Sequence, residues 1–500
     1  MNATPASPPA PSTPPEDPGR RRFMSLTAGF AAAASAPALG AAQGASGTPA
    51  ASPAAGDVLD VIIVGAGLSG LTAARDLRRA GCESFAVLEA NARVGGRTLN
   101  HDLGSGRFSE AGGQWIGPGQ TAIADLARQL GVGTFPTYYQ GETVLLAGSG
   151  KLAMDLDGSF GTDPKLAAKL NALARDVPAG APWRAARAAE LDAQSVGDWL
   201  AQQKLSASDQ IGWNMTVLLT CGTAPAKMGL LHFLSMINSA SGRYEELDSI
   251  KHSAQETRIE GGSQILSLKM AAALGNKLHL STPVRAIQGW NGPVLTLDTD
   301  RGPLQARRVI LAIPPSSCQR IAFGPELPAA RRALQRHWPA YSPGRKTAHV
   351  YARPFWRDKG LSGHILQAEG PVIWAYDNSP ADASIGVINA FVMQAALPAE
   401  ATKAGPILAD IYARALGDEA RRPLQFHDQD WGREPWIPSC VSAIPPGFWT
   451  RHGEALHPPV GGLIWSGTET AEIWAGYMDG AVRSGQRAAL QVLQSLRQPG

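Results

Sequence analysis

The feature that most constrains the fold of this chain is a strand–turn–helix pattern around residue 65. A β-branched run at 61–64, preceded by Asp60, is followed directly by a turn with the spacing Gly-x-Gly-x-x-Gly at 65–70. Such a run predicts a buried parallel strand, and apolar residues then recur at helical spacing from 68 to 77. The three glycines of such a turn make the tight bend, let backbone approach a pyrophosphate, and let the helix pack closely on its strand.

An acidic residue at a suitable distance strengthens this interpretation. A second predicted strand, 85–88, ends at Glu89, which lies 24 residues after Gly65. A carboxylate there can accept hydrogen bonds from an adenosine ribose, and the helix start offers free N–H groups to a phosphate. We therefore predict a dinucleotide site, with a glycine-rich turn that binds no ligand as the alternative. The residues of this site are Gly65, Gly67, Leu68, Ser69, Gly70 and Glu89.

The composition argues against several classes of function. With 500 residues, of which 44% are hydrophobic, the chain can form two or more domains with a large core. The net charge of +3 is small and no basic run interleaves with aromatic residues, so we expect no nucleic-acid partner. The four cysteines lack metal-binding spacing, which argues against a zinc site. Free thiols are favoured, and a disulfide between two of them stays open.

The first 56 residues differ in character from the rest. They are rich in Pro, Ala, Ser and Gly, which is typical of a disordered linker. Residues 20–26, Arg-Arg-Arg-Phe-Met-Ser-Leu, precede a mild apolar run and resemble a twin-arginine export signal. No stretch reaches the length of a membrane span. We expect a periplasmic or secreted protein that uses the twin-arginine export machinery, or a cytoplasmic one if the signal is not used.

Two glycine-rich segments follow Glu89. At 93–97, Arg-Val-Gly-Gly-Arg places two guanidinium groups, which bind phosphate bidentately, around a glycine pair. At 110–117, consecutive glycines let backbone pass against a flat ligand. With the first turn, these segments resemble the N-terminal FAD module of the flavin amine oxidases, the monoamine oxidase family. The resemblance implies further FAD contacts from Ala90, Arg93, Gly95, Gly96, Arg97, Gly113, Gln114 and Trp115.

The C-terminal region carries the same resemblance. A predicted strand leads into Gly-Thr-Glu-Thr at 467–470, then Trp-x-Gly-Tyr-Met-x-Gly-Ala from 474, and a helix that runs to about 496. The pattern is similar to the monoamine oxidase branch, and a helix start beside the flavin would stabilise negative charge on the reduced ring. The FAD contacts that the resemblance implies in the second half of the chain are Val284, Gly467, Glu469, Tyr477 and Met478.

Lys346 and Tyr477 are the predicted catalytic residues. Lys346 lies on a predicted strand at 344–351, ten residues before Trp356. A lysine on a strand is more often a solvated edge residue, but the resemblance implies that this one holds a water against flavin N5. By the same resemblance, Tyr477 is one of two aromatic rings that flank the substrate amine.

The position of the second ring departs from the family pattern. Monoamine oxidases have a Cys-Tyr pair before Phe-Pro-Pro-Gly, and that cysteine carries the covalent bond to the flavin. Counting back from Pro-Pro-Gly at 445–447 puts Ser439 at the cysteine position and Cys440 at the tyrosine position. We therefore favour non-covalent FAD, while a covalent link through Cys440 stays open.

The predicted fold class is α/β, with a Rossmann-like FAD-binding domain and a discontinuous α+β substrate domain. The FAD-binding domain is expected at 57–134, 251–321 and 431–497. The substrate domain is expected at 135–250 and 322–430, and residues 122–247 are expected to be mostly helical.

The resemblance implies oxidation of an amine to an imine, which hydrolyses to an aldehyde or ketone. Hydride passes to flavin N5, and O2 reoxidises the flavin to give hydrogen peroxide. The expected partners are a small amine and oxygen. Two alternatives stay open: an amine dehydrogenase that passes electrons to a periplasmic redox protein, and a non-catalytic flavin-fold binding module. The sequence does not identify the amine, and it is compatible with a homodimer.

Overall fold

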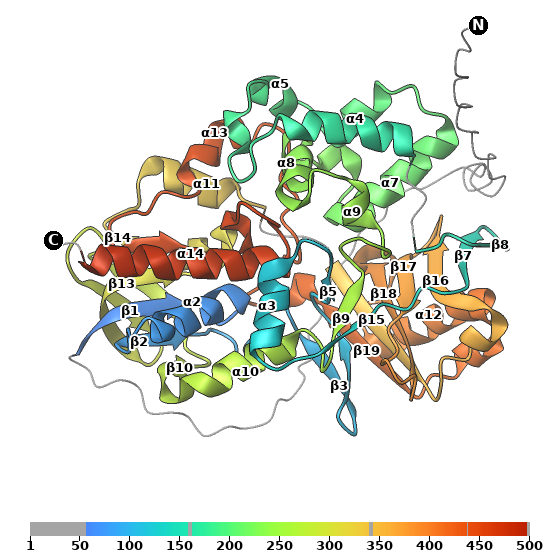
Figure 1. Ribbon diagram of the computed structural model, residues 1–500, viewed down its shortest axis with the longest axis horizontal. Helices are drawn as coiled ribbons and strands as arrows, with labels where there is room; N and C mark the ends of the chain where they lie inside the picture. Colours follow the sequence, from blue (N-terminus) through green and yellow to red (C-terminus); the bar gives the residue numbers. More distant parts are fainter. Residues whose placement is uncertain (1–56, 159–162, 340–343, 438, 498–500) are drawn as a thin grey trace, which may run out of the picture.

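The computed structural model describes residues 57–158, 163–339, 344–437 and 439–497. Two large β-sheets and a group of helices make up most of this part of the chain (Figure 1). In Figure 1 the first sheet lies at the lower left, the second at the right, and the helical group above them. The resemblance to an export signal falls on residues outside the described ranges.

The strand predicted before the glycine turn is β1, Val58–Val64, and it lies in the middle of the first sheet. It runs parallel to β2 on one side and to β13 on the other. Ile62 and Ile63 are completely buried, as expected of a parallel strand that is covered on both faces. The strand order is β10-β2-β1-β13-β12-β11-β14, and β20 also pairs with β13. The other strands are β2 Phe85–Leu88, β10 Leu278–His279, β11 Val284–Gln288, β12 Leu295–Thr299, β13 Gly302–Leu311, β14 Ala322–Gly324 and β20 Leu463–Trp465.

Four helices share an apolar cluster with one face of β1 (Figure 1). They are α2 Leu68–Arg79, α3 Thr121–Gln129, α10 Gln264–Leu274 and α14 Met478–Arg497. Glycines allow α2 to approach its neighbours closely. A Cβ at Gly70 would lie 2.0 Å from the carbonyl oxygen of Gly65, and one at Gly485 would lie 2.3 Å from that of Ser69. Gly70 thus gives the close helix–strand packing that the turn predicts.

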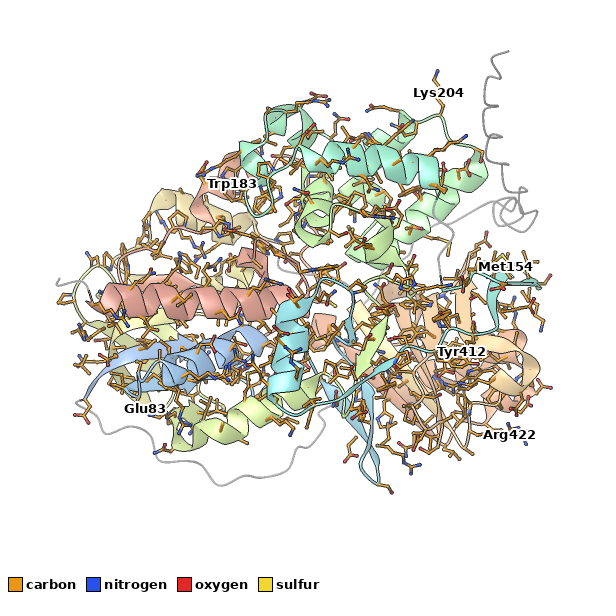
Figure 2. All side chains as sticks on the ribbon, viewed as in Figure 1. Glu83, Met154, Trp183, Lys204, Tyr412 and Arg422 are labelled. Atoms are coloured by element: carbon orange, nitrogen blue, oxygen red, sulfur yellow. The ribbon has the colours of Figure 1, made fainter. Side chains whose placement is uncertain are left out.

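The second sheet has the order β19-β15-β18-β17-β16-β7-β8 and is antiparallel except at the β16–β7 pair. Helix α12, Ala401–Leu416, covers one of its faces. Tyr412 of this helix is completely buried in the cluster between helix and sheet (Figure 2). The strands are β7 Glu142–Ala147, β8 Gly150–Met154, β15 Gly344–Tyr351, β16 Leu361–Gln367, β17 Val372–Asp377, β18 Gly386–Met393 and β19 Gln425–Asp430.

The expectation that 122–247 is mostly helical is wrong over 134–154, which follows α3. Strands β6, Thr134–Pro136, β7 and β8 occupy 134–154, and β7 joins the second sheet beside β16. The apolar run Val144–Leu146 is buried. A run this short fits a helix or a strand equally well by periodicity, and its pairing with residues of β16 more than 200 positions later decides the outcome.

The helical group has its own core, in which Trp199, Leu200, Phe233 and Leu234 are buried. Its helices are α4 Pro164–Arg175, α5 Ala188–Asp192, α6 Val196–Ala201, α7 Ala207–Cys221, α8 Leu230–Ala240, α9 Glu245–Asp248, α11 Ala329–His337 and α13 Trp449–His452. Two small sheets complete the fold. They are formed by β3 Asn100–Gly104 with β4 Arg107–Glu110, and by β5 Trp115–Ile116 with β9 Thr257–Ile259 and β6.

The sheets combine segments that are far apart in the chain, as a discontinuous architecture requires. Strand β14 lies in the first sheet, although we expected the corresponding FAD segment to end at 321. The domain limits stay predictions. No helix within the described ranges is long and apolar enough to cross a membrane.

Candidate active site

A cavity of about 430 Å³ extends between the two sheets and the helical group. It is lined by the glycine turn, by Lys346 and Phe391 of the second sheet, and by His232 and Met236 of α8. All three parts of the fold therefore contribute to one site.

The glycine turn forms an open cradle at the start of α2. Gly67 is the N-cap residue and no side chain caps the first turn of the helix. A Cβ at Gly96 would lie 3.3 Å from the Cα of Gly67, so the two loops approach backbone to backbone. Gly65 has a φ of +104°, a conformation that favours glycine. Uncapped N–H groups in a side-chain-free cradle suit a pyrophosphate, so the residues present fit FAD here.

Glu89 is held at the carboxyl end of β2. Its Oε2 accepts a hydrogen bond from Ala66 N at 2.7 Å, and its Oε1 accepts from Asn91 N at 2.9 Å. Glu89, Ala90 and Val284 all line the cavity, on the side where an adenosine would lie in the predicted site. The carboxylate is thus fixed in place before any ligand is bound.

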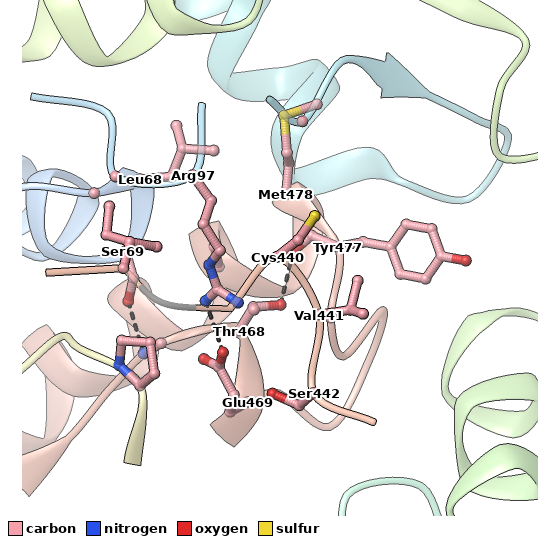
Figure 3. A pocket seen from close by; sticks show the side chains of 18 of the residues that line it. Leu68, Ser69, Arg97, Cys440, Val441, Ser442, Thr468, Glu469, Tyr477 and Met478 are labelled. Atoms are coloured by element: carbon pink, nitrogen blue, oxygen red, sulfur yellow. Dashed lines mark hydrogen bonds and ion pairs between the residues drawn. The ribbon is translucent and has the colours of Figure 1, made fainter. Parts of the chain in front are cut away.

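The arginines of the 93–97 segment have different surroundings. Arg97 lines the cavity and pairs with Glu469 at 2.7 Å (Figure 3). Arg93 does not line it. Arg93 Nη1 donates to Gly96 O at 2.9 Å, and Arg93 Nη2 faces the carboxylate of Glu434. These contacts stabilise the loop at 93–97.

A group of serines ties the C-terminal return to the glycine turn. Gly467 N donates to Ser69 Oγ at 3.0 Å and to Ser484 Oγ at 3.1 Å. Ser69 Oγ also lies 2.5 Å from Ser466 Oγ. The Ser69 hydroxyl is therefore engaged within the protein, and its backbone remains the part that faces the cavity.

Tyr477 and Met478 stand at the start of α14. Thr468 Oγ1 donates to Tyr477 O at 2.7 Å, which holds this end of the helix against the turn at 468–470. The Tyr477 ring packs edge-on against Trp474 at 5.0 Å and extends away from the Arg97–Glu469 pair (Figure 3). Met478 lies against Gly113, where a Cβ would be 3.4 Å from its side chain. Both residues line the cavity.

Lys346 is a buried residue of an interior strand. β15 lies between β18 and β19, so the edge-strand alternative does not apply. Lys346 Nζ donates to Gly112 O at 3.0 Å and to Gln114 Oε1 at 2.6 Å. Burial lowers the pKa of Lys346 to about 7. The Lys346 amine therefore gains or loses its proton near neutral pH.

The comparison with known proteins decides the family. Residues 68–493 match the family model described as flavin containing amine oxidoreductase. The chain belongs to this family. The expected enzyme class, an oxidoreductase that acts on CH–NH2 groups, is confirmed.

The alignments of this amine oxidoreductase with individual relatives cover nearly all of its described residues. A candidate flavin-containing monoamine oxidase of Mycobacterium tuberculosis, AofH, is 39% identical over 87% of this chain and 96% of its own. An L-amino acid dehydrogenase of Synechocystis is 34% identical over 87% of this chain and 94% of its own. The solved structure of a putrescine oxidase bound to putrescine matches with a TM-score of 0.80 at 34% identity, over 87% of this chain and 99% of that one. The α/β fold class is thereby confirmed.

The structure brings most of the predicted site residues of this amine oxidoreductase to one cavity. The exceptions are Gly70, which packs α2 on its strand, and Arg93. Of the neighbouring aromatic residues, Trp115 and Trp436 line the cavity, whereas Trp374, Tyr376 and Trp474 do not.

Cys440 lines the cavity and Ser439 does not. The Ser439 hydroxyl donates to Val441 O. Burial raises the pKa of the Cys440 thiol, although Arg97 and Lys346 oppose this effect. All four cysteines of the chain are free. The disulfide that the sequence left open is therefore not formed.

Sequence reasoning missed the polar surroundings of Lys346. Asn378, Glu110 and Arg258 form a buried hydrogen-bonded group behind Gln114. Arg258 comes from β9, a three-residue strand, and Asn378 follows β17 directly. No motif spacing connects these residues, because only the pairing of separate strands brings them together.

Proposed function

We propose that this enzyme oxidises a monoamine with an apolar or aromatic body to its imine, with O2 as electron acceptor. The observation that carries the proposal is that Lys346 and Tyr477 share one cavity, which continues into a mostly apolar wall. When bound along the glycine cradle, FAD supplies the hydride acceptor. The apolar residues that line the same cavity include Leu219, Met228, Met236, Leu247, Trp338 and Trp449.

The roles of Lys346 and Tyr477 follow from their contacts. An ammonium has three N–H donors, and Gly112 and Gln114 take two of those of Lys346. One donor is left to hold a water in the cavity. The Tyr477 ring offers an aromatic face that orients the amine by cation–π attraction and packing.

The charges on the cavity wall favour a monoamine over a diamine. Of the described residues that line the cavity, only Glu89 and Glu469 carry carboxylates. Glu89 lies at the ribose end and Glu469 is paired with Arg97. Among the described residues, no carboxylate of this wall is therefore left for a second ammonium group, whose burial without a partner is costly. The putrescine oxidase relative, by contrast, binds a diamine.

The arginines that line the cavity already have partners, which argues against an amino acid as substrate. Arg97 is paired with Glu469, and Arg345 forms a salt bridge with Asp428. The third lining arginine, Arg320, stacks over Trp436 at 5.5 Å. The carboxylate of an amino acid would thus have to break an existing contact. We therefore expect a substrate of a different class from the one named for the L-amino acid dehydrogenase relative.

The test is steady-state turnover of the FAD-loaded enzyme with phenylethylamine, butylamine, putrescine and phenylalanine. We expect the two monoamines to consume O2 with equal production of hydrogen peroxide, and the other two compounds to react at least about tenfold more slowly in kcat/KM. Turnover that needs an artificial acceptor in place of oxygen would favour the amine dehydrogenase. If the protein binds FAD but oxidises none of the amines, the result would favour a non-catalytic binding module.

We also propose that FAD is bound non-covalently. The Ser439 hydroxyl is engaged with Val441, and the raised pKa of Cys440 keeps its thiol protonated and poorly nucleophilic. Denaturation in acid should release the yellow colour into the supernatant. Colour that stays with the protein pellet would contradict this and indicate a link through Cys440.

Export by the twin-arginine route is a further proposal, supported by the arginine cluster at 20–22. Replacing these arginines by lysine should trap the protein in the cytoplasm, as cell fractionation would show. An unchanged distribution between the fractions would contradict export by this route.

A further inference from the structure

A chain of buried polar side chains begins at Lys346. Gln114 Oε1 accepts hydrogen bonds from Lys346 Nζ at 2.6 Å and from Tyr376 Oη at 2.9 Å. On its other side, Gln114 Nε2 donates to Asn378 Oδ1. Gln114 and Asn378 are 2% and 0% exposed, so neither amide can exchange these partners for bulk water.

The chain ends at a buried ion pair. Asn378 Nδ2 donates to Glu110 Oε2 at 2.8 Å, and Arg258 Nη2 donates to the same oxygen at 2.9 Å. The Glu110 and Arg258 side chains are 0% and 2% exposed. Arg258 is further held by Ser379 O at 2.6 Å. The pair with Arg258 thus holds the Glu110 carboxylate in place at the end of the chain, and removal of either partner would leave an uncompensated charge.

These hydrogen bonds can run in only one direction. An ammonium only donates, so Gln114 must turn its oxygen toward Lys346. Its NH2 group then faces the oxygen of Asn378, and the NH2 group of Asn378 faces a carboxylate, which only accepts. Reversing either amide would place an NH2 group against another donor. The two amide dipoles are therefore aligned between the anion of Glu110 and the cation of Lys346.

Lys346 needs such support because it is 3% exposed and reaches solvent only through the cavity that it lines. Phe391 lies 5.3 Å from Nζ and the ring of Trp115 5.4 Å from it, and neither offers a carboxylate. Burial lowers the pKa of Lys346, and Glu110 is the strongest influence that raises it. The charged or titratable groups that face Lys346 from neighbouring elements are Glu110, Arg258, His101, Tyr376 and Cys440.

We propose that Gln114 and Asn378 are positioning residues that hold the Lys346 ammonium at the cavity wall by linking it to the Glu110 carboxylate. The inference rests on the proposed function, which gives Lys346 its role in the cavity. It adds that the charge state of this lysine is set from behind the cavity. Loss of either amide removes this support and shifts the equilibrium of Lys346 toward the neutral amine.

The test titrates Lys346 directly in the FAD-loaded protein. Lysine labelled with 13C at Cε gives an NMR signal for Lys346, which is assigned by its loss in Lys346→Met. We expect the pKa of about 7 to fall by about one pH unit in Gln114→Leu, because the ammonium loses a hydrogen-bond acceptor. We expect the same fall in Asn378→Ala, because Gln114 is then no longer linked to Glu110. In Gln114→Glu it should rise by about one pH unit or more, because a carboxylate takes the place of the amide.

Asn171→Ala is the matched control. Asn171 is also a buried asparagine that donates to a glutamate, Glu245, at 2.9 Å, but it lies in the helical group. Its removal should leave the titration of Lys346 unchanged.

Unchanged pKa values in both Gln114→Leu and Asn378→Ala would overturn the proposal. If Asn378→Ala fails to bind FAD, Asn378→Ser leaves a small hydroxyl in the polar site and should show the same fall. The titration needs no turnover. Amines that fail to react would therefore count against the proposed function alone, and an unshifted Lys346 would count against the positioning chain alone.

Discussion

At the scale of residues, Lys346 is a buried amine on the wall of the cavity. It is 3% exposed, and its hydrogen-bond partners are one backbone carbonyl and one amide. A buried ammonium loses its hydration, and neutral acceptors replace that hydration only in part. The buried amine therefore lowers stability, and the role that we propose for it in the cavity would explain its presence.

Lys346→Met should stabilise the protein most below pH 7. The pKa of Lys346 is about 7 in the folded protein against a usual value of 10.5. Between these values the unfolded chain holds a proton that the folded chain does not, so stability rises with pH by up to about 1.4 kcal/mol per pH unit. Methionine removes this dependence. Thermal unfolding from pH 6 to pH 10 should show a gap between variant and wild type that narrows as pH rises, and a constant gap would contradict the account.

Removal of the Tyr477 ring should weaken the use of substrate without unfolding the protein. The ring lies on the cavity and contacts Trp474 at 5.0 Å. Tyr477→Ala should lower kcat/KM for a monoamine about tenfold, the effect of a lost cation–π contact of about 1.4 kcal/mol. Tyr477→Phe keeps the ring and should stay within about threefold of wild type. Equal losses in the two variants would show that the hydroxyl, not the ring, matters.

At the scale of elements, regular local patterns were predictable and pairings at a distance were not. Several elements lie where their sequence patterns indicate: the glycine turn, β1, α2, β15 and α14. Each of these patterns reflects the burial of its own residues. The hairpin β7–β8 was missed because its partner β16 comes much later in the chain. Gln114 and Lys346 are likewise 232 positions apart, so no local pattern links them.

Gly67→Ala should weaken FAD binding while leaving the fold intact. A Cβ at Gly67 would have Gly96 Cα, at 3.9 Å, as its nearest neighbour, so the protein has room for it. The methyl group would stand on the cavity wall where the pyrophosphate is expected to lie. We expect the Kd for FAD to rise about tenfold or more, measured by flavin fluorescence.

Gly150→Ala is the control for this substitution. Gly150 lies in β8, away from the cavity, and a Cβ there would have only Ala147 O, at 3.5 Å, close by. Unchanged FAD affinity in Gly67→Ala would show that the pyrophosphate does not pass over this glycine.

At the scale of the whole molecule, two of the three parts that form the site carry histidines that burial keeps neutral. His232, His349 and His364 each face a backbone carbonyl through Nε2, which fixes the proton on that nitrogen. Burial lowers the pKa of each to about 4. One lies in the helical group and two lie in the second sheet.

The protein should therefore lose stability steeply between pH 6.5 and pH 4. In this window the unfolded chain binds protons that the folded chain excludes, so each histidine lowers stability by up to about 1.4 kcal/mol per pH unit as pH falls. His349→Gln keeps an N–H donor for Gly405 and cannot titrate. Its thermal midpoint should fall less than that of wild type between pH 7 and pH 5. An identical fall would exclude His349 as a source of acid sensitivity.

The most direct test of the central claim is anaerobic mixing of the FAD-loaded enzyme with amines while the visible flavin absorption is followed. The account predicts that monoamines with an apolar or aromatic body bleach the flavin, that putrescine and phenylalanine do so far more slowly, and that air restores the colour. A flavin that stays oxidised with every primary, secondary and aromatic amine would contradict the account.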